Sequence, residues 1–234
     1  MSDLPSTKKR KSEGWRQSKW LAFAEFGIVA LIFLADEKHL VPVSKTPFLL
    51  LLGWISIRMR GLRWRSVGLT LNRGWLRTLA LGVGAGLLME AFELFVSQPL
   101  LIRITGKQPD LSDFQALYGN LKWTLILLAL TWPLAAFGEE MVWRGYLMNR
   151  VADLGKNTRL AWMVSLVAVN IGFGFAHSYQ GITGIIDEGL MGVLLGLFYL
   201  GTDCNLSVPI IAHGITDTVD LLLIFFGKYP GMGR

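Results

Sequence analysis

The stretch that decides the fold is residues 121–144, LKWTLILLALTWPLAAFGEEMVWR. Between Trp123 and Phe137 it carries no charged residue and is almost wholly apolar, which is typical of a segment that lies in a bilayer. The run ends on two adjacent carboxylates, Glu139 and Glu140, with Arg144 four residues after the second. Because ionisable groups are costly to hold at or inside a membrane, they indicate a functional site.

The composition indicates that the rest of the chain also lies in a membrane. Of its 234 residues, 52% are hydrophobic and only 17% are charged, which is too apolar for an ordinary soluble domain. Apolar segments recur at about 20–35, 46–57, 76–101, 121–143, 160–177, 189–201 and 207–227. We therefore predict an all-α fold, a polytopic membrane bundle of six to eight helices.

Four parts follow from these segments. We expect a basic cytoplasmic tail at residues 1–19, N-terminal membrane helices at 20–120, a helical core at 121–227 and a short C-terminal tail at 228–234. The single cysteine, Cys204, excludes an internal disulfide.

The basic residues gather in three stretches, 8–19, 58–77 and 144–159, and each stretch flanks an apolar segment. Positive loops favour the cytoplasmic side of a membrane. We therefore expect the N-terminus and the loops 58–75 and 144–159 on the cytoplasmic side of a cell membrane. Despite the net charge of +6, the pattern speaks against a nucleic-acid groove. Residues 58–69 mix basic and apolar side chains, and suit either a segment on the membrane surface or a solvated basic loop.

The two glutamates are predicted to have different tasks. On a helix Glu140 and Arg144 face each other and can pair, whereas Glu139 points about 100° away, toward another neighbour. The paired carboxylate would be structural, and the free one could take a proton from water. The alternative is a charge-paired helix end at the membrane interface.

Two histidines fall in or beside later apolar segments. His177 closes the run Phe173-Gly174-Phe175-Ala176-His177, and His213 precedes Asp217 by four residues, so these last two share a helix face. Asp217 could orient the imidazole, or both could ligate a metal or a water. The plainer alternatives are an interfacial histidine and a His–Asp pair that only packs helices together.

Taken together, Glu139-Glu140-x-x-x-Arg144, Phe173-x-x-x-His177 and His213-x-x-x-Asp217 resemble the CPBP family of intramembrane proteases. That family includes the type II CAAX prenyl endopeptidases and bacterial proteins linked to bacteriocin self-immunity. The resemblance covers roughly residues 121–227, which would then be the catalytic core.

The resemblance implies that Glu139 activates water with His177 beside it, and that Glu140 and Arg144 shape the site. It also implies that His213 and position 217 complete a pocket for water or metal. The family often carries Asn where this chain has Asp217, and an ionised Asp cannot donate a hydrogen bond to an oxyanion. A role for position 217 as a ligand or as a partner that orients the histidine survives.

Two mechanisms fit these residues. In one, His177, His213 and the carboxylate of Glu139 bind zinc, which activates a water, in keeping with the common labelling of the family as metalloproteases. In the other, Glu139 and His177 activate water without a metal. The chain has no His-Glu-x-x-His zinc helix, which favours the second mechanism.

The predicted function is therefore cleavage of a peptide bond in a membrane-associated protein or peptide. A prenylated CAAX-type C-terminus, a bacteriocin leader and a membrane-anchored regulator are all compatible substrates. The alternatives are a non-catalytic scaffold or immunity protein and a small proton-coupled transporter, although a transporter would be expected to show an inverted repeat.

One conflict arises if every segment is a straight span. Glu139 and His213 would then lie near the cytoplasmic face, and His177 near the opposite face. Either the helix of residues 121–150 runs on past the membrane, or the segment 160–177 is tilted or broken at Gly172.

Overall fold

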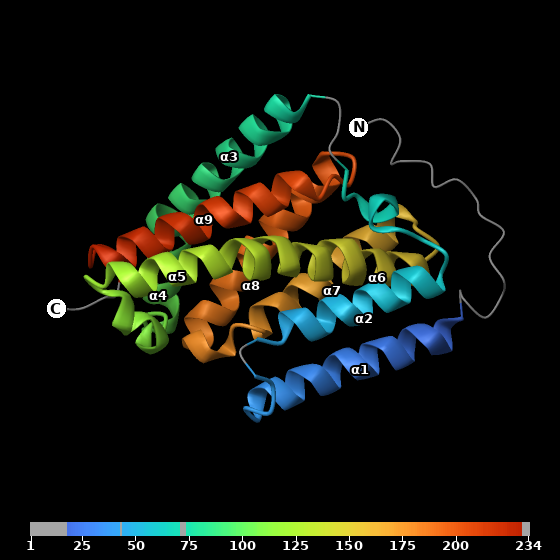
Figure 1. The fold of residues 1–234 in the computed structure, drawn as a ribbon, viewed down its shortest axis with the longest axis horizontal. Coiled ribbons are helices and arrows are strands. Elements are labelled where there is room, and N and C mark those ends of the chain that lie inside the picture. The colour runs from blue at the N-terminus through green and yellow to red at the C-terminus, as the bar shows by residue number, and fades with distance from the viewer. Residues whose placement is uncertain (1–17, 43, 71–73, 231–234) are drawn as a thin grey trace.

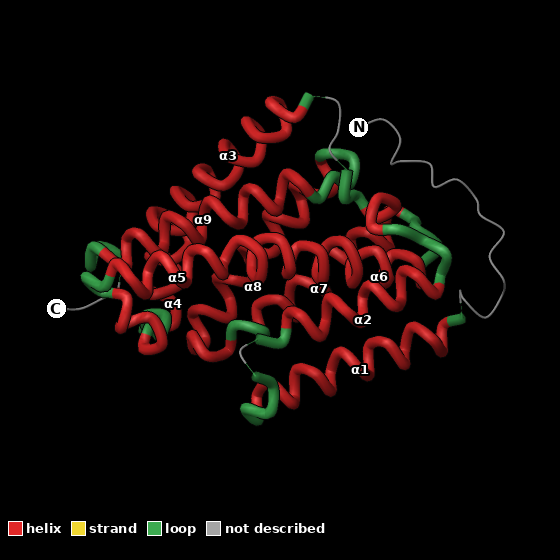
Figure 2. The backbone as a smooth tube through the Cα atoms, in the orientation of Figure 1, coloured by secondary structure: helices red, strands yellow, loops and turns green. Residues whose placement is uncertain are grey.

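The computed structural model describes residues 18–42, 44–70 and 74–230, and in these residues it contains helices, turns and loops but no strand (Figure 2). The predicted all-α fold is confirmed. Most of the predicted basic tail and the last residues of the predicted C-terminal tail lie outside the described residues.

The helices follow the apolar segments (Figure 1). They are α1 (Lys19–Glu37), α2 (Thr46–Met59), α3 (Trp75–Phe92), α4 (Gln98–Thr105), α5 (Leu121–Thr131), α6 (Asn149–Leu154), α7 (Arg159–Phe175), α8 (Gly181–Gly201) and α9 (Ser207–Phe225). A π-helical turn, Glu93–Ser97, joins α3 to α4, and two π-helical segments, Trp132–Glu139 and Met141–Met148, join α5 to α6.

Four helical stretches of the described chain are long and apolar enough to cross a membrane: Trp75–Thr105, Leu121–Leu154, Ser178–Gly201 and Ser207–Phe225. Two shorter helices, α2 and α7, are also apolar. Large apolar side chains such as Phe95 and Leu160 are exposed on the outside, 79% and 70% respectively, which suits contact with lipid. The chain is an integral membrane protein, and how many of its shorter helices cross the bilayer stays a prediction.

The stretch Leu121–Leu154, hereafter the long helix, bears on the conflict over the predicted spans. Its 34 residues are well above the roughly 20 that a helix needs to cross the hydrocarbon core of a bilayer. α7 runs unbroken through Gly172, which excludes the break there, whereas the tilt of α7 in a membrane stays a prediction. The predicted loop 144–159 is wrong in its first part, because the helix continues to Leu154.

The core lies around the second half of the long helix. All eight residues of Met141–Met148 are buried, and six of them, all but Arg144 and Gly145, form a cluster with apolar side chains of α2, α7 and α8. Residues 58–69 pack against this core. Val67 is buried, and its carbonyl oxygen accepts a hydrogen bond from the Tyr199 hydroxyl at 2.8 Å. The carbonyl oxygen of Gly68 accepts a hydrogen bond from the backbone N–H of Leu206 at 2.9 Å. This stretch is therefore packed against α8 and α9, and its depth in the membrane stays a prediction.

Glycine allows α3 to lie close against α9. A Cβ at Gly86 would come within 2.7 Å of the carbonyl oxygen of Ala212, and one at Gly82 within 2.6 Å of the Ile211 side chain. Small residues at helix contacts are common in membrane bundles because they let backbones approach closely. Ala212 precedes His213, so this contact also positions the candidate site.

Candidate active site

Glu140 and Arg144 form a fully buried ion pair in the long helix. Arg144 Nη1 donates to Glu140 Oε1 at 2.7 Å, and both side chains have 0% exposure. The predicted pairing is therefore present. Arg144 Nη2 donates to Asn170 Oδ1 at 2.9 Å and to the carbonyl of Gly192 at 2.7 Å, so the guanidinium links the long helix to α7 and α8.

His213 completes this buried network from α9. Its Nδ1 lies 2.9 Å from Glu140 Oε1, and its Nε2 lies 3.5 Å from Asp217 Oδ1. Both ring nitrogens thus face carboxylates, one from the long helix and one from its own helix. Arg144 and His213 share one oxygen of Glu140, Oε1, so this carboxylate is held in place by both.

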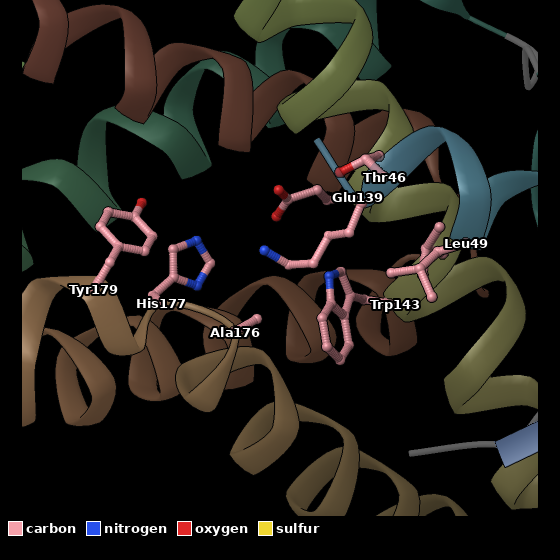
Figure 3. A pocket seen from close by; sticks show the side chains of 9 residues that line it. Thr46, Leu49, Glu139, Trp143, Ala176, His177 and Tyr179 are labelled. Atoms are coloured by element: carbon pink, nitrogen blue, oxygen red, sulfur yellow. The ribbon is translucent and has the colours of Figure 1, made fainter. Parts of the chain in front are cut away.

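Glu139 faces a different space. It lines a small cavity of about 70 Å³, which we name the catalytic cavity after the predicted role of Glu139, together with Lys45, Thr46, Leu49, Val142, Trp143, Ala176, His177 and Tyr179. Figure 3 shows the Glu139 carboxylate and the His177 ring pointing into this space from opposite sides. The structure therefore brings Glu139 of the long helix and His177 at the end of α7 to one cavity.

The His177 ring is fixed by its own helix. Its Nδ1 lies 2.9 Å from the carbonyl oxygen of Phe173, which can only accept, so Nδ1 carries the proton. In the neutral ring Nε2 is then an acceptor. Figure 3 shows one ring nitrogen on the side of Glu139.

Phe173 connects the cavity to the buried network. Its ring centroid lies 4.8 Å from that of His177 and 6.2 Å from that of His213, and the guanidinium of Arg144 lies 4.8 Å from the same ring. This fully buried ring packs between the two histidines and makes them parts of one site.

Three residues at the site were not singled out in the sequence. Asn170 accepts from Arg144, Gly192 offers its carbonyl, and Lys45 lines the catalytic cavity while its Nζ donates to Asp36 at 2.8 Å. Asn170 carried a signal, because an amide in an otherwise apolar run needs a partner. Lys45 and Gly192 carried none, since their places depend on how the helices pack.

The predicted zinc ligands do not fit a three-residue metal site in this arrangement. Both nitrogens of His213 face carboxylates, and Nδ1 of His177 is committed to Phe173. Within the described chain, the ligand atoms of His177, His213 and Glu139 do not gather closely enough to share one ion. We therefore derive no chemical step through a metal here.

A comparison with protein families agrees with this geometry. Residues 121–219 match the family model described as "Type II CAAX prenyl endopeptidase Rce1-like". This segment, hereafter the Rce1-like domain, is similar to that family over 99 of the chain's 234 residues. Comparisons with curated proteins and with solved structures gave no match.

The Rce1-like domain begins at the first residue of α5 and ends within α9. It contains all six residues predicted for the site: Glu139, Glu140, Arg144, His177, His213 and Asp217. The predicted resemblance to CAAX-type membrane proteases is thereby confirmed. The family match thus makes endopeptidase activity the first candidate for this chain.

Proposed function

We propose that this protein is an intramembrane endopeptidase in which Glu139 activates water directly, with His177 beside it and without a metal. The observation that carries the proposal is the separation of the two glutamates. Glu140 is locked by Arg144 and His213, whereas Glu139 shares a cavity with His177.

The chemistry follows from the lining of the catalytic cavity, which has room for water. A water molecule donates one hydrogen bond to His177 Nε2 and gives its other proton to Glu139. The resulting hydroxide attacks the scissile carbonyl carbon. Glu139 then passes the proton to the amide nitrogen as the C–N bond breaks. Lys45, held by Asp36, is the cation that lines the cavity and would stabilise the oxyanion.

The substrate class is suggested by a second, larger pocket. This apolar pocket, of about 490 Å³, lies between α1, the long helix and α7, and shares Lys45, Trp143 and Ala176 with the catalytic cavity. Its lining is mainly aliphatic and aromatic. We propose that it holds the lipid chain of a prenylated, CAAX-type peptide while the peptide reaches Glu139.

We further propose that the protein resides in the cell membrane with its N-terminus in the cytoplasm. The basic stretches at 58–77 and 144–159 support this orientation, since positive loops favour the cytoplasmic side.

The test is cleavage of a farnesylated CAAX peptide by the full-length protein in vesicles. We expect Glu139→Gln to lower kcat at least about 100-fold, as loss of a general base does, while its thermal unfolding is unchanged. Asp113→Asn, an exposed carboxylate-to-amide change in the 3-10 helix Ser112–Leu117, is the matched control and should retain activity. Full activity of Glu139→Gln would refute the assignment.

Two further outcomes separate the alternatives. A non-catalytic scaffold predicts that Glu139→Gln lowers stability and that the wild type does not cleave the peptide. Zinc chemistry predicts loss of cleavage with a chelator that removes zinc but leaves Mg²⁺ and Ca²⁺ in place, whereas the proposed mechanism predicts no change.

A further inference from the structure

Three carboxylates converge beyond the proposed catalytic residues, where α3 and its π-helical turn pack on α9. They are Glu90 of α3, Glu93 at the start of the turn, and Asp220 of α9. One oxygen from each lies within 4.8 Å of the others. All three lie outside the Rce1-like domain and outside its sequence motifs.

The carboxylate of Glu90 has no partner for its charge. Glu90 is only 4% exposed, and neither of its oxygens has a hydrogen-bond donor within the described chain. Oδ1 of Asp220 is also buried without a donor. No described Lys, Arg or His forms an ion pair with Glu90, Glu93 or Asp220, although unpaired buried charge is costly.

Neighbouring groups hold Glu93 in place. The Tyr229 hydroxyl donates to Glu93 Oε1 at 3.1 Å and accepts from Gln98 Nε2 at 2.9 Å. Such outer contacts are typical of carboxylates that bind metal ions. The π-helical turn at Glu93 is a further sign, because these turns occur frequently at functional sites.

The ligand chemistry selects the ion. Carboxylate oxygens without histidine or cysteine suit hard cations such as Mg²⁺, Ca²⁺ and Mn²⁺. These ions hold oxygens at about 2.0–2.6 Å, so that ligands on one ion lie up to about 5 Å apart. The 4.8 Å spread of Glu90, Glu93 and Asp220 is within this range.

We propose that Glu90, Glu93 and Asp220 bind one divalent cation of the Mg²⁺, Ca²⁺ and Mn²⁺ class. The ion neutralises two of the three carboxylate charges, of which Glu90 is buried and Glu93 and Asp220 are partly buried. It ties α3, which precedes the Rce1-like domain, to α9, which carries His213 and Asp217. Its role is structural, and it does not depend on the proposed catalytic mechanism.

The experiment uses Mn²⁺ as the probe on full-length protein, purified in detergent and freed of metal with a chelator. Electron paramagnetic resonance counts the free Mn²⁺, and we expect one site per chain that Ca²⁺ or Mg²⁺ displaces. Glu90→Gln and Asp220→Asn should each weaken binding at least about tenfold. Asp113→Asn and Glu139→Gln should bind as the wild type does, which separates this site from the catalytic cavity.

A second measurement, the thermal stability of the wild type, tests the proposal even if the variants fail to fold. Removal of metal from the wild type should lower its Tm, and added Mn²⁺ should restore it in proportion to occupancy. Absence of both the Mn²⁺ site and the Tm shift overturns the proposal. So does binding that survives in Glu90→Gln and Asp220→Asn, or that disappears only in Glu139→Gln. Metal-independent stabilisation by Glu90→Gln would show instead that the carboxyl groups share protons.

Discussion

The guanidinium of Arg144 is completely buried, and two of its nitrogens reach three partners on three helices. Arginine suits this place because its planar fork can serve several acceptors at once. Gly192 contributes by lacking a side chain: a Cβ there would come within 2.7 Å of Asn170 Oδ1 and 3.2 Å of Arg144 Nη2. The network therefore fixes where Glu140, α7 and α8 lie with respect to each other.

Replacing Arg144 with Met should destabilise the protein strongly. The change leaves the buried carboxylate of Glu140 without its arginine partner, which typically costs about 3–5 kcal/mol of unfolding free energy. Arg58→Met, at the exposed end of α2, is the matched control and should stay within about 0.5 kcal/mol. Chemical denaturation in detergent measures both, and equal effects of the two changes would contradict the role of the network.

At the scale of elements, the decisive contact is the one between α3 and α9. Gly86 lies against the Ala212 carbonyl, one residue before His213, whereas a Cβ at Gly84 of the same helix would meet nothing within 4 Å. The two glycines therefore form a matched pair, of which only one is needed for close packing.

Gly86→Ala should lower stability by about 1–3 kcal/mol, because an added methyl group forces α3 away from the α9 backbone. It should also reduce cleavage, since His213 moves with Ala212. Gly84→Ala should be neutral or slightly stabilising, as alanine favours helix. Thermal unfolding and peptide cleavage check both variants, and similar losses in the two would show that the close approach has no special role.

The face of α1 that lines the apolar pocket gives a second prediction at this scale. Val29→Trp should fill the pocket and raise KM for a farnesylated peptide about tenfold, equivalent to about 1.4 kcal/mol of binding. Ile28→Trp, on the exposed side of the same helix, should leave KM unchanged. Equal KM values for the two variants would show that the lipid chain does not bind in this pocket.

At the scale of the whole molecule, the orientation in the membrane can be tested by labelling. In a Cys204→Ala background, Lys156→Cys and Ser178→Cys place exposed thiols at the two ends of α7. If α7 crosses the bilayer as predicted, a membrane-impermeant reagent should reach position 156 from the cytoplasmic side and position 178 from the opposite side. Labelling of both from one side would contradict this topology.

The sequence by itself determined the all-α membrane bundle, the approximate helices and the ion pair of Glu140 with Arg144. These features depend on composition and on spacing along one chain segment, where a separation of four residues fixes which side chains share a helix face. The same spacing placed His213 beside Asp217 and separated the directions of Glu139 and Glu140.

Only the tertiary structure decided which groups meet across helices. His213 binds Glu140 as well as facing Asp217, Lys45 reaches the catalytic cavity, and Glu90 meets Asp220. The packing of the long helix against α7 places Glu139 and His177 on one cavity, although equal straight spans would have kept them apart. The physical reason is that helix length, crossing and close glycine contacts are set by packing among distant segments, which no local spacing encodes.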